Sequence, residues 1–136
     1  MRILFLEDDP VIADIVREFL SESYEVQHCF DSQTALQYAE DEDFSLYIFD
    51  INVPGISGID LLRSLRDFND ATPAIFITAY QDVEHLKEGF SAGANDFIRK
   101  PFELDELQVI LRRALHVARL ERESQELLKA GYRETF

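Results

Sequence analysis

The chain has 136 residues, 46% of them hydrophobic, and its 27 acidic and 13 basic residues give a formal net charge of −14. This length and composition fit one globular domain with a single core. The negative charge argues against direct nucleic-acid binding, which requires clustered Lys and Arg. The lone Cys29 cannot form an internal disulfide, and no apolar run approaches the roughly 20 residues of a membrane helix. With no signal-like start, the sequence predicts a cytoplasmic protein without membrane contact.

Short apolar runs alternate along the chain with longer segments of helical period. The runs predict strands at residues 2–6, 25–29, 46–49, 74–78 and 96–98. The segments between them have helix start signals at Asp31 or Ser32, at Ser57 and at Asp82, and a stop signal at Gly93. This alternation is typical of an α/β fold with a parallel sheet, and the nearly continuous apolar character of the first, third and fourth strands places them at its centre.

The last predicted helix begins near Glu103 and meets no breaker before Gly131. Its end is rich in charge, with a loose heptad-like stripe that includes Leu120 and Leu127. Both a solvated tail helix and a dimerising or linking coil fit this pattern. We therefore divide the chain into a domain of residues 1–120 and a C-terminal extension of residues 121–136.

Polar and charged side chains lie where four of the predicted strands end. Asp8 and Asp9 follow the first strand, Asp50 follows the third, Thr78 ends the fourth and Lys100 follows the fifth. Function in parallel α/β sheets collects at the carboxyl ends of the strands. If the first and third strands are neighbours, their carboxylates form an acidic pocket suited to Mg²⁺. With Asp8 and Asp9 at its rim, strand alternation points Glu7 away from this pocket.

Four segments, LEDDP, FDINVPGISGIDLL, FITAY and AGANDFIRKPFELDEL, together resemble the receiver domain of two-component response regulators. The resemblance covers roughly residues 1–120. It implies a CheY-like, flavodoxin-like (βα)5 fold: a doubly wound, parallel, five-stranded sheet of strand order 2-1-3-4-5, here with an extended C-terminal helix.

The resemblance also implies the chemistry of the acidic pocket. Asp50 matches the phosphoacceptor, a carboxylate that takes a phosphoryl group from the phosphohistidine of a sensor histidine kinase or a phosphotransfer protein. Asp8 and Asp9 match the acidic pair that holds Mg²⁺, together with Asp50 and the backbone carbonyl of Asn52. The metal offsets the repulsion between an anionic nucleophile and an anionic phosphoryl group.

Further matches concern the response to phosphorylation. Lys100 and Thr78 match the groups that contact the phosphoryl oxygens, and Pro101 matches a proline that follows a cis peptide bond. Phe97 matches an aromatic switch residue that turns inward as Thr78 moves. The switch would alter the face formed by the fourth helix, fifth strand and fifth helix, through which an output domain or partner protein is engaged. Such a protein is a switch rather than an enzyme, although it catalyses its own phosphorylation and dephosphorylation.

One departure from the family concerns dimerisation. Ile110 stands where receivers attached to winged-helix DNA-binding domains carry an arginine for an intersubunit ion pair. Asp96 and Lys87 still fit the other ion-pair positions. A homodimer through this face therefore stays open.

Two functions from other classes remain as alternatives. A Mg²⁺-dependent phosphohydrolase could use Asp50 as its nucleophile, but Asn52 stands where it would need a second acid, and an amide cannot act as a general acid or base. A flavin-binding module would need a phosphate-cradling loop after the first strand, where this chain has three carboxylates. For the receiver, Asn52 and Tyr80 match the positions beside the path of hydrolytic water, and the bulk of Tyr80 predicts a long-lived phosphoryl group.

Overall fold

The computed structural model describes residues 1–79 and 83–131, in which strands and helices alternate. The elements are β1 (Arg2–Leu6), α1 (Pro10–Ser21), β2 (Glu25–Cys29), α2 (Ser32–Asp41), β3 (Leu46–Asp50), α3 (Gly58–Asp67), β4 (Ala74–Thr78), α4 (Val83–Ala92), β5 (Asp96–Arg99) and α5 (Leu104–Lys129). The strands predicted from the apolar runs are confirmed, each within one residue. The start signal predicted at Asp82 lies outside the described residues.

All five strands are parallel and lie in the order β2-β1-β3-β4-β5, as predicted. Leu6 of β1 pairs with Phe49 of β3, and Asp50 of β3 pairs with Ile77 of β4. The chain order reverses between β1 and β3, so the crevice at the carboxyl ends of these two strands is the position where such sheets place their sites.

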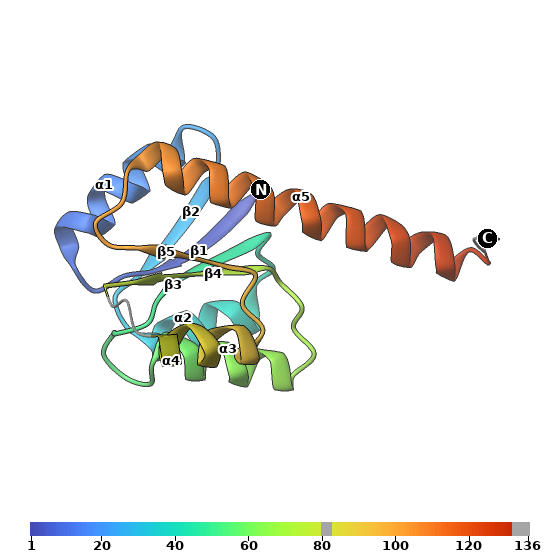
Figure 1. The fold of residues 1–136 in the computed structure, drawn as a ribbon, viewed down its shortest axis with the longest axis horizontal. Coiled ribbons are helices and arrows are strands. Elements are labelled where there is room, and N and C mark those ends of the chain that lie inside the picture. The colour runs from blue at the N-terminus through green and yellow to red at the C-terminus, as the bar shows by residue number, and fades with distance from the viewer. Residues whose placement is uncertain (80–82, 132–136) are drawn as a thin grey trace.

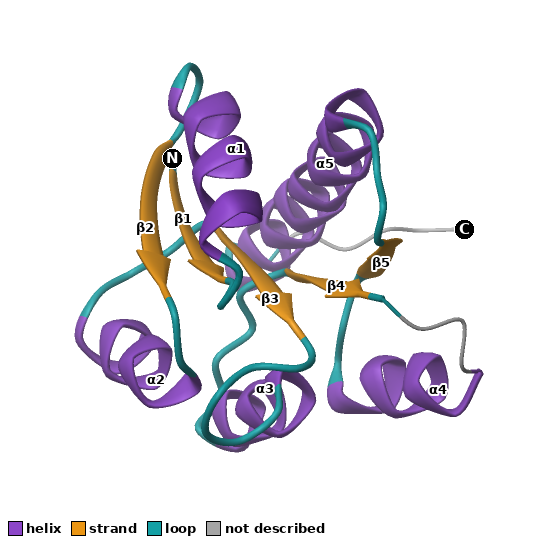
Figure 2. Cartoon of the chain, turned by 90° about the vertical axis from the view of Figure 1, so that its left-hand side faces the viewer, coloured by secondary structure: helices purple, strands orange, loops and turns teal. Residues whose placement is uncertain are grey.

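Helices cover both faces of the sheet: α1 and α5 lie on one side, and α2, α3 and α4 on the other (Figure 2). Alternate strand residues supply the two cores. Ile3 and Phe5 pack in the cluster with α1 and α5, whereas Leu4 and Leu6 pack in the cluster on the opposite face. This alternation is the period of two that a strand imposes, and it decides which side of the sheet each polar residue reaches where a strand ends.

The helix ends follow the signals in the sequence. The Asp31 side chain accepts a hydrogen bond from Thr34 N at 2.8 Å, and Ser57 Oγ accepts one from Asp60 N at 3.1 Å, so both residues are N-caps. Gly93 follows α4 with φ of 106°, a left-handed conformation that glycine adopts without a steric penalty.

Helix α5 continues far beyond the sheet (Figure 1). Leu107, Leu111 and Ala114 are its buried residues, whereas Leu120 is 49% exposed and Leu127 is 51% exposed. The outer part of the helix therefore takes no part in either core. No helix in the described parts of the chain combines the length and the apolar character needed to cross a bilayer.

Candidate functional site

A lysine and two carboxylates meet at the carboxyl edge of the sheet, each from the end of a different strand. Lys100 Nζ lies 2.6 Å from Asp50 Oδ2 and 2.7 Å from Glu7 Oε1. The side chains of Glu7 and Asp50 are 0% and 6% exposed, and that of Lys100 is 19% exposed. A cation thus holds together two buried anions that would otherwise repel each other.

The prediction that Glu7 points away from the pocket is wrong. Pairing of Leu6 with Phe49 places the next residues, Glu7 and Asp50, side by side. Glu7 continues the side of β1 that carries Phe5, because the strand pattern runs one residue beyond Leu6. Alternation counted forward from the apolar residues of β1 gives Glu7 this direction only if the strand continues one residue past Leu6, and the pairing of β1 in the sheet decides that.

The carboxylate of Asp9 has a different role from the predicted one. Glu7 N donates to Cys29 O at 3.0 Å and keeps the chain in the sheet, after which the backbone turns into α1. Asp9 is the N-cap of α1, and its Oδ1 accepts hydrogen bonds from Val11 N at 2.9 Å and Ile12 N at 3.4 Å. In the structure Glu7 therefore takes the place predicted for Asp9: the carboxylates that cluster and could hold a metal ion are Glu7, Asp8 and Asp50.

The pocket has a donor set that fits a divalent cation. Glu7, Asp8 and Asp50 each offer one carboxylate oxygen, and these oxygens lie within 4.8 Å of one another. Glu7 Oε1 is buried, and its close contact is the ion pair with Lys100 Nζ. A hard oxygen set with one exposed member, Asp8, suits Mg²⁺, which keeps several of its waters. The Asn52 carbonyl stays a predicted ligand.

Burial and neighbouring charges in the pocket shift the pKa values of Glu7 and Lys100. Burial, reinforced by the neighbouring Asp50 carboxyl, raises the pKa of Glu7 to about 7 against the opposing effect of Lys100. Burial disfavours the charge on Lys100, but the hydrogen bonds that Lys100 donates to Asp50 and Glu7, together with their Coulombic attraction, outweigh it and raise the pKa of Lys100. The lysine therefore stays charged at neutral pH.

The loop after β3 holds Asp50 in place. Asn52 N donates to Asp50 Oδ1 at 3.0 Å, so both carboxylate oxygens have a partner, one from the backbone and one from Lys100. At Gly58, the start of α3, a Cβ atom would lie only 2.3 Å from the Asp50 carbonyl oxygen. The absence of a side chain there lets α3 begin directly against the strand that carries Asp50.

The other predicted site residues lie at the same edge of the sheet. Thr78 ends β4 with 1% of its surface exposed, and its carbonyl accepts a hydrogen bond from Lys100 N at 2.8 Å. The peptide bond between Lys100 and Pro101 is cis, as predicted. The roles of Thr78 and Lys100 toward a phosphoryl group stay predictions. Tyr80 lies outside the described residues.

Charged side chains on the face formed by α4, β5 and α5 form ion pairs within the chain. Asp96 on β5 forms an ion pair with Arg113 of α5, and Lys87 lies 3.9 Å from Glu84 on the exposed side of α4. Both predicted ion-pair positions thus have intrachain partners. Phe97 is partly buried and packs between β4 and α4.

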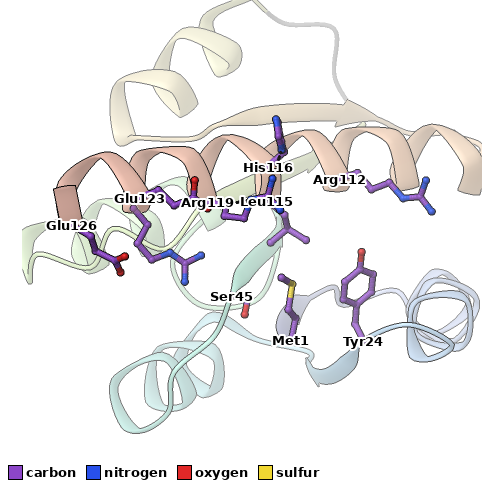
Figure 3. A pocket seen from close by; sticks show the side chains of 10 residues that line it. Met1, Tyr24, Ser45, Arg112, Leu115, His116, Arg119, Glu123 and Glu126 are labelled. Carbon is purple, nitrogen blue, oxygen red and sulfur yellow. Dashed lines mark hydrogen bonds and ion pairs between the residues drawn. The ribbon is translucent and has the colours of Figure 1, made fainter. Parts of the chain in front are cut away.

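A second hollow, of about 550 Å³, lies beneath α5 and is a separate feature (Figure 3). Tyr24 and Ser45, which line its lower side, directly precede β2 and β3, so the hollow is at the amino ends of the strands. Arginines and glutamates of α5 line the upper side. It shares no residue with the acidic pocket, which is the site that the topology favours.

Comparison with known proteins agrees with this geometry. Residues 3–112 match the family described as the response regulator receiver domain. The chain is 40% identical over 114 residues to the transcriptional regulatory protein CrdR of Helicobacter pylori, covering 82% of this chain and 54% of CrdR. It is 37% identical over 134 residues to the regulatory protein AtoC of Escherichia coli, covering 95% of this chain and 28% of AtoC. The chain therefore spans about half or less of the length of these relatives.

Solved structures show the same fold. A CheY-like response regulator receiver domain protein from Methanospirillum hungatei superposes with a TM-score of 0.84 at 30% identity, covering 88% of this chain and 97% of that one. NtrX from Brucella abortus superposes with a TM-score of 0.87 at 31% identity, covering 99% of this chain and 31% of NtrX. The acidic pocket, its lysine, the strand order and these matches together show that the chain belongs to the response regulator receiver domain family.

Proposed function

We propose that this chain is a phosphorylation-controlled signalling switch of the cytoplasm. It accepts a phosphoryl group on Asp50 in a Mg²⁺-dependent reaction, and the modification changes the affinity of the face formed by α4, β5 and α5 for an output domain or partner protein. The observation that carries the proposal is the convergence of Glu7, Asp50 and Lys100, with Lys100 Nζ within 2.7 Å of both carboxylates.

The chemistry is a transfer between two nucleophiles. A carboxylate oxygen of Asp50 attacks the phosphorus of a phosphohistidine, the P–N bond breaks, and its electron pair returns to the imidazole of the donor. Lys100 supplies a cation beside the attacking carboxylate, where it can offset the negative charge of the phosphoryl oxygens, and Asn52 N orients the carboxylate through Oδ1. The product is an acyl phosphate on Asp50.

A Mg²⁺ ion held by Glu7, Asp8 and Asp50 would lower the repulsion between the anionic nucleophile and the anionic phosphoryl group. Binding of the ion and of the phosphoryl group sets a requirement for each of two residues. Glu7 must be ionised to act as a ligand, and Lys100 must give up part of its contact with the carboxylates to reach phosphoryl oxygens.

The donor has a surface on which to dock. An apolar hollow of about 340 Å³ lies beside Lys100 and is lined by Ile12, Ile15, Val16, Pro101, Phe102 and Leu104. Ile15 is 51% exposed and the adjacent Val11 is 66% exposed. We propose that an apolar surface of the histidine kinase or phosphotransfer protein covers this hollow, which brings its phosphohistidine over Asp50.

Incubation with acetyl phosphate and Mg²⁺ tests the proposal. Intact-mass spectrometry should detect one added phosphoryl group on the wild-type chain, none on Asp50→Asn, and one on the control Asp67→Asn, which removes an exposed carboxylate of α3. A label that persists in Asp50→Asn would place the nucleophile elsewhere.

The same experiment separates the switch from a phosphohydrolase. A switch accumulates the phosphorylated chain while the donor is present, whereas a hydrolase turns over the donor without accumulating it. Rapid release of inorganic phosphate without a detectable phosphorylated chain would favour the hydrolase.

A further inference from the structure

The ring of Phe97 occupies the space in which a side chain at residue 89 would lie. Gly89 is buried in α4, and a Cβ atom on it would be 2.3 Å from Cζ and 3.1 Å from Cε1 of Phe97. Carbon atoms in good contact are roughly 3.5–4.0 Å apart, so this space cannot hold both groups. The missing side chain of Gly89 therefore forms a notch that receives the ring, which we call the Gly89 notch.

Two other aromatic rings complete the walls of the Gly89 notch. Phe76, the β4 residue paired with Phe97, has its ring centroid 5.5 Å away, and Phe90 of α4 lies 4.9 Å away in an edge-on arrangement. Both distances lie in the range of favourable aromatic pairs. Phe90 is 53% exposed, so the notch lies just below the surface that α4 presents to a partner.

A glycine inside a ten-residue helix is otherwise a disadvantage. It loses more conformational freedom on folding than alanine and weakens the helix. Gly89 offsets this cost by giving Phe97 a place between α4 and the sheet. An alanine would meet the far end of an aromatic ring rather than backbone, and rotation about χ1 can move that ring, so the substitution should displace Phe97 rather than unfold α4.

The Gly89 notch is connected to the acidic pocket through two adjacent strands. Phe76 and Thr78 lie on β4, and Phe97 lies on β5, three positions before Lys100. Lys100 N donates to Thr78 O at 2.8 Å and joins the two strand ends at the pocket. A change at the pocket and a change in the ring therefore act on the same pair of strands.

We propose that Gly89 is a positioning residue of the switch: by keeping the notch open it allows Phe97 to lie inward, and it thereby sets the shape of the surface that α4 and β5 offer to a partner. This inference rests on the proposed function, in which Phe97 responds to the phosphorylation of Asp50. A side chain at residue 89 closes the notch and holds the ring outward.

Nuclear Overhauser effects measure the position of the ring directly. The wild type should show strong effects between the α-protons of Gly89 and the ring of Phe97. In Gly89→Ala, the effects between residue 89 and this ring should be lost, while the control Ser91→Ala, on the exposed side of α4, should keep them. In Gly89→Ala, contacts between the new methyl group and the Phe97 ring at wild-type strength would overturn the proposal.

Thermal unfolding provides a second, independent readout. Gly89→Ala should lower Tm in the wild-type background, because the ring is expelled from its site. In a Phe97→Ala background the same substitution should lower Tm less or not at all, because the clash at 2.3 Å is gone and only Phe76 Cδ2, at 3.1 Å, still opposes the gain in helix propensity. An equal change of Tm in both backgrounds would contradict the proposed contact.

The functional readout is the phosphorylated fraction reached at a fixed concentration of acetyl phosphate. It should fall at least threefold in Gly89→Ala and stay unchanged in Ser91→Ala, because closing the notch removes a ring position that phosphorylation favours. An unchanged fraction in Gly89→Ala, with a phosphorylated wild type, overturns the positioning role. A wild type that takes no phosphoryl group refutes the proposed function instead, and the ring position is then decided by the nuclear Overhauser effects.

Discussion

Lys100 Nζ lies 2.6 Å from Asp50 Oδ2, although the two residues are 50 positions apart in the chain. The parallel sheet brings them together. Strand β4 lies between β3 and β5, and all three strands end at the same edge of the sheet. The same ammonium group contacts Glu7 Oε1, so one cation serves two buried carboxylates. Removal of any member of this group changes the electrostatic balance of the other two.

Substitution of Lys100 by Met should destabilise the metal-free protein by about 2 kcal/mol, because two buried carboxylates lose their cation, while the partial exposure of the lysine reduces the penalty. Mg²⁺ should restore more of the lost Tm in Lys100→Met than it adds to the wild type, since the metal replaces the missing charge. Thermal unfolding with EDTA and with Mg²⁺ checks both expectations. Lys87→Met, at an exposed position of α4, is the control. Equal Mg²⁺ effects in wild type and Lys100→Met would argue against a shared site.

Metal affinity should depend on Glu7 and Asp8 and not on Asp9. Glu7→Gln and Asp8→Asn should each weaken Mg²⁺ binding by about tenfold or more, because each removes a charged ligand. Asp9→Ala should leave the affinity nearly unchanged and instead destabilise the fold by about 1 kcal/mol through loss of the N-cap. Calorimetric Mg²⁺ titration together with thermal unfolding separates the two effects. A larger loss of affinity in Asp9→Ala than in Glu7→Gln would restore Asp9 as a ligand.

The raised pKa of Glu7 predicts the direction of the pH dependence of stability. Because the pKa is about 7 in the folded protein and lies above its ordinary value of 4.5, the folded state binds this proton more tightly than the unfolded state. The Glu7 contribution is therefore fully present below pH 4.5 and is lost as pH rises toward and through 7. With EDTA present, the wild type should lose stability over this window relative to Glu7→Gln. If the difference in free energy of unfolding between wild type and Glu7→Gln stayed constant as pH rises, or grew in favour of the wild type, the raised pKa of Glu7 would be refuted.

The phosphoryl group should persist for many minutes or longer in the wild type and decay faster in Tyr80→Ala. This prediction rests on sequence position, since Tyr80 lies outside the described residues. The bulk of the ring should shield the acyl phosphate from water, and its hydroxyl is too weak a base near neutral pH to activate one. Decay of radiolabelled protein after removal of the donor measures both rates. A rate in Tyr80→Ala equal to or below that of the wild type would rule out shielding.

The sequence by itself determined the elements of this protein and most of the residues of its pocket. Strand positions follow from apolar runs and helix ends from caps such as Asp31 and Ser57, because these signals act over a few residues of chain. The ends of the strands then place Asp50, Thr78 and Lys100 at one edge for any parallel sheet in which their strands lie together. The strand positions and helix caps depend on local chemistry, and the shared edge depends only on the common direction of the parallel strands.

Only the tertiary structure decided which carboxylate next to Asp50 enters the pocket. The choice between Glu7 and Asp9 depends on how far β1 stays paired with its neighbours before the backbone turns, and that pairing involves Cys29 of β2 and Phe49 of β3. The notch at Gly89 depends in the same way on the packing of α4 against a ring from β5. Contacts between segments far apart in the chain therefore decide both the pocket carboxylate and the notch. For the carboxylate the register is decisive, because a shift of one residue reverses the side to which every side chain of a strand points.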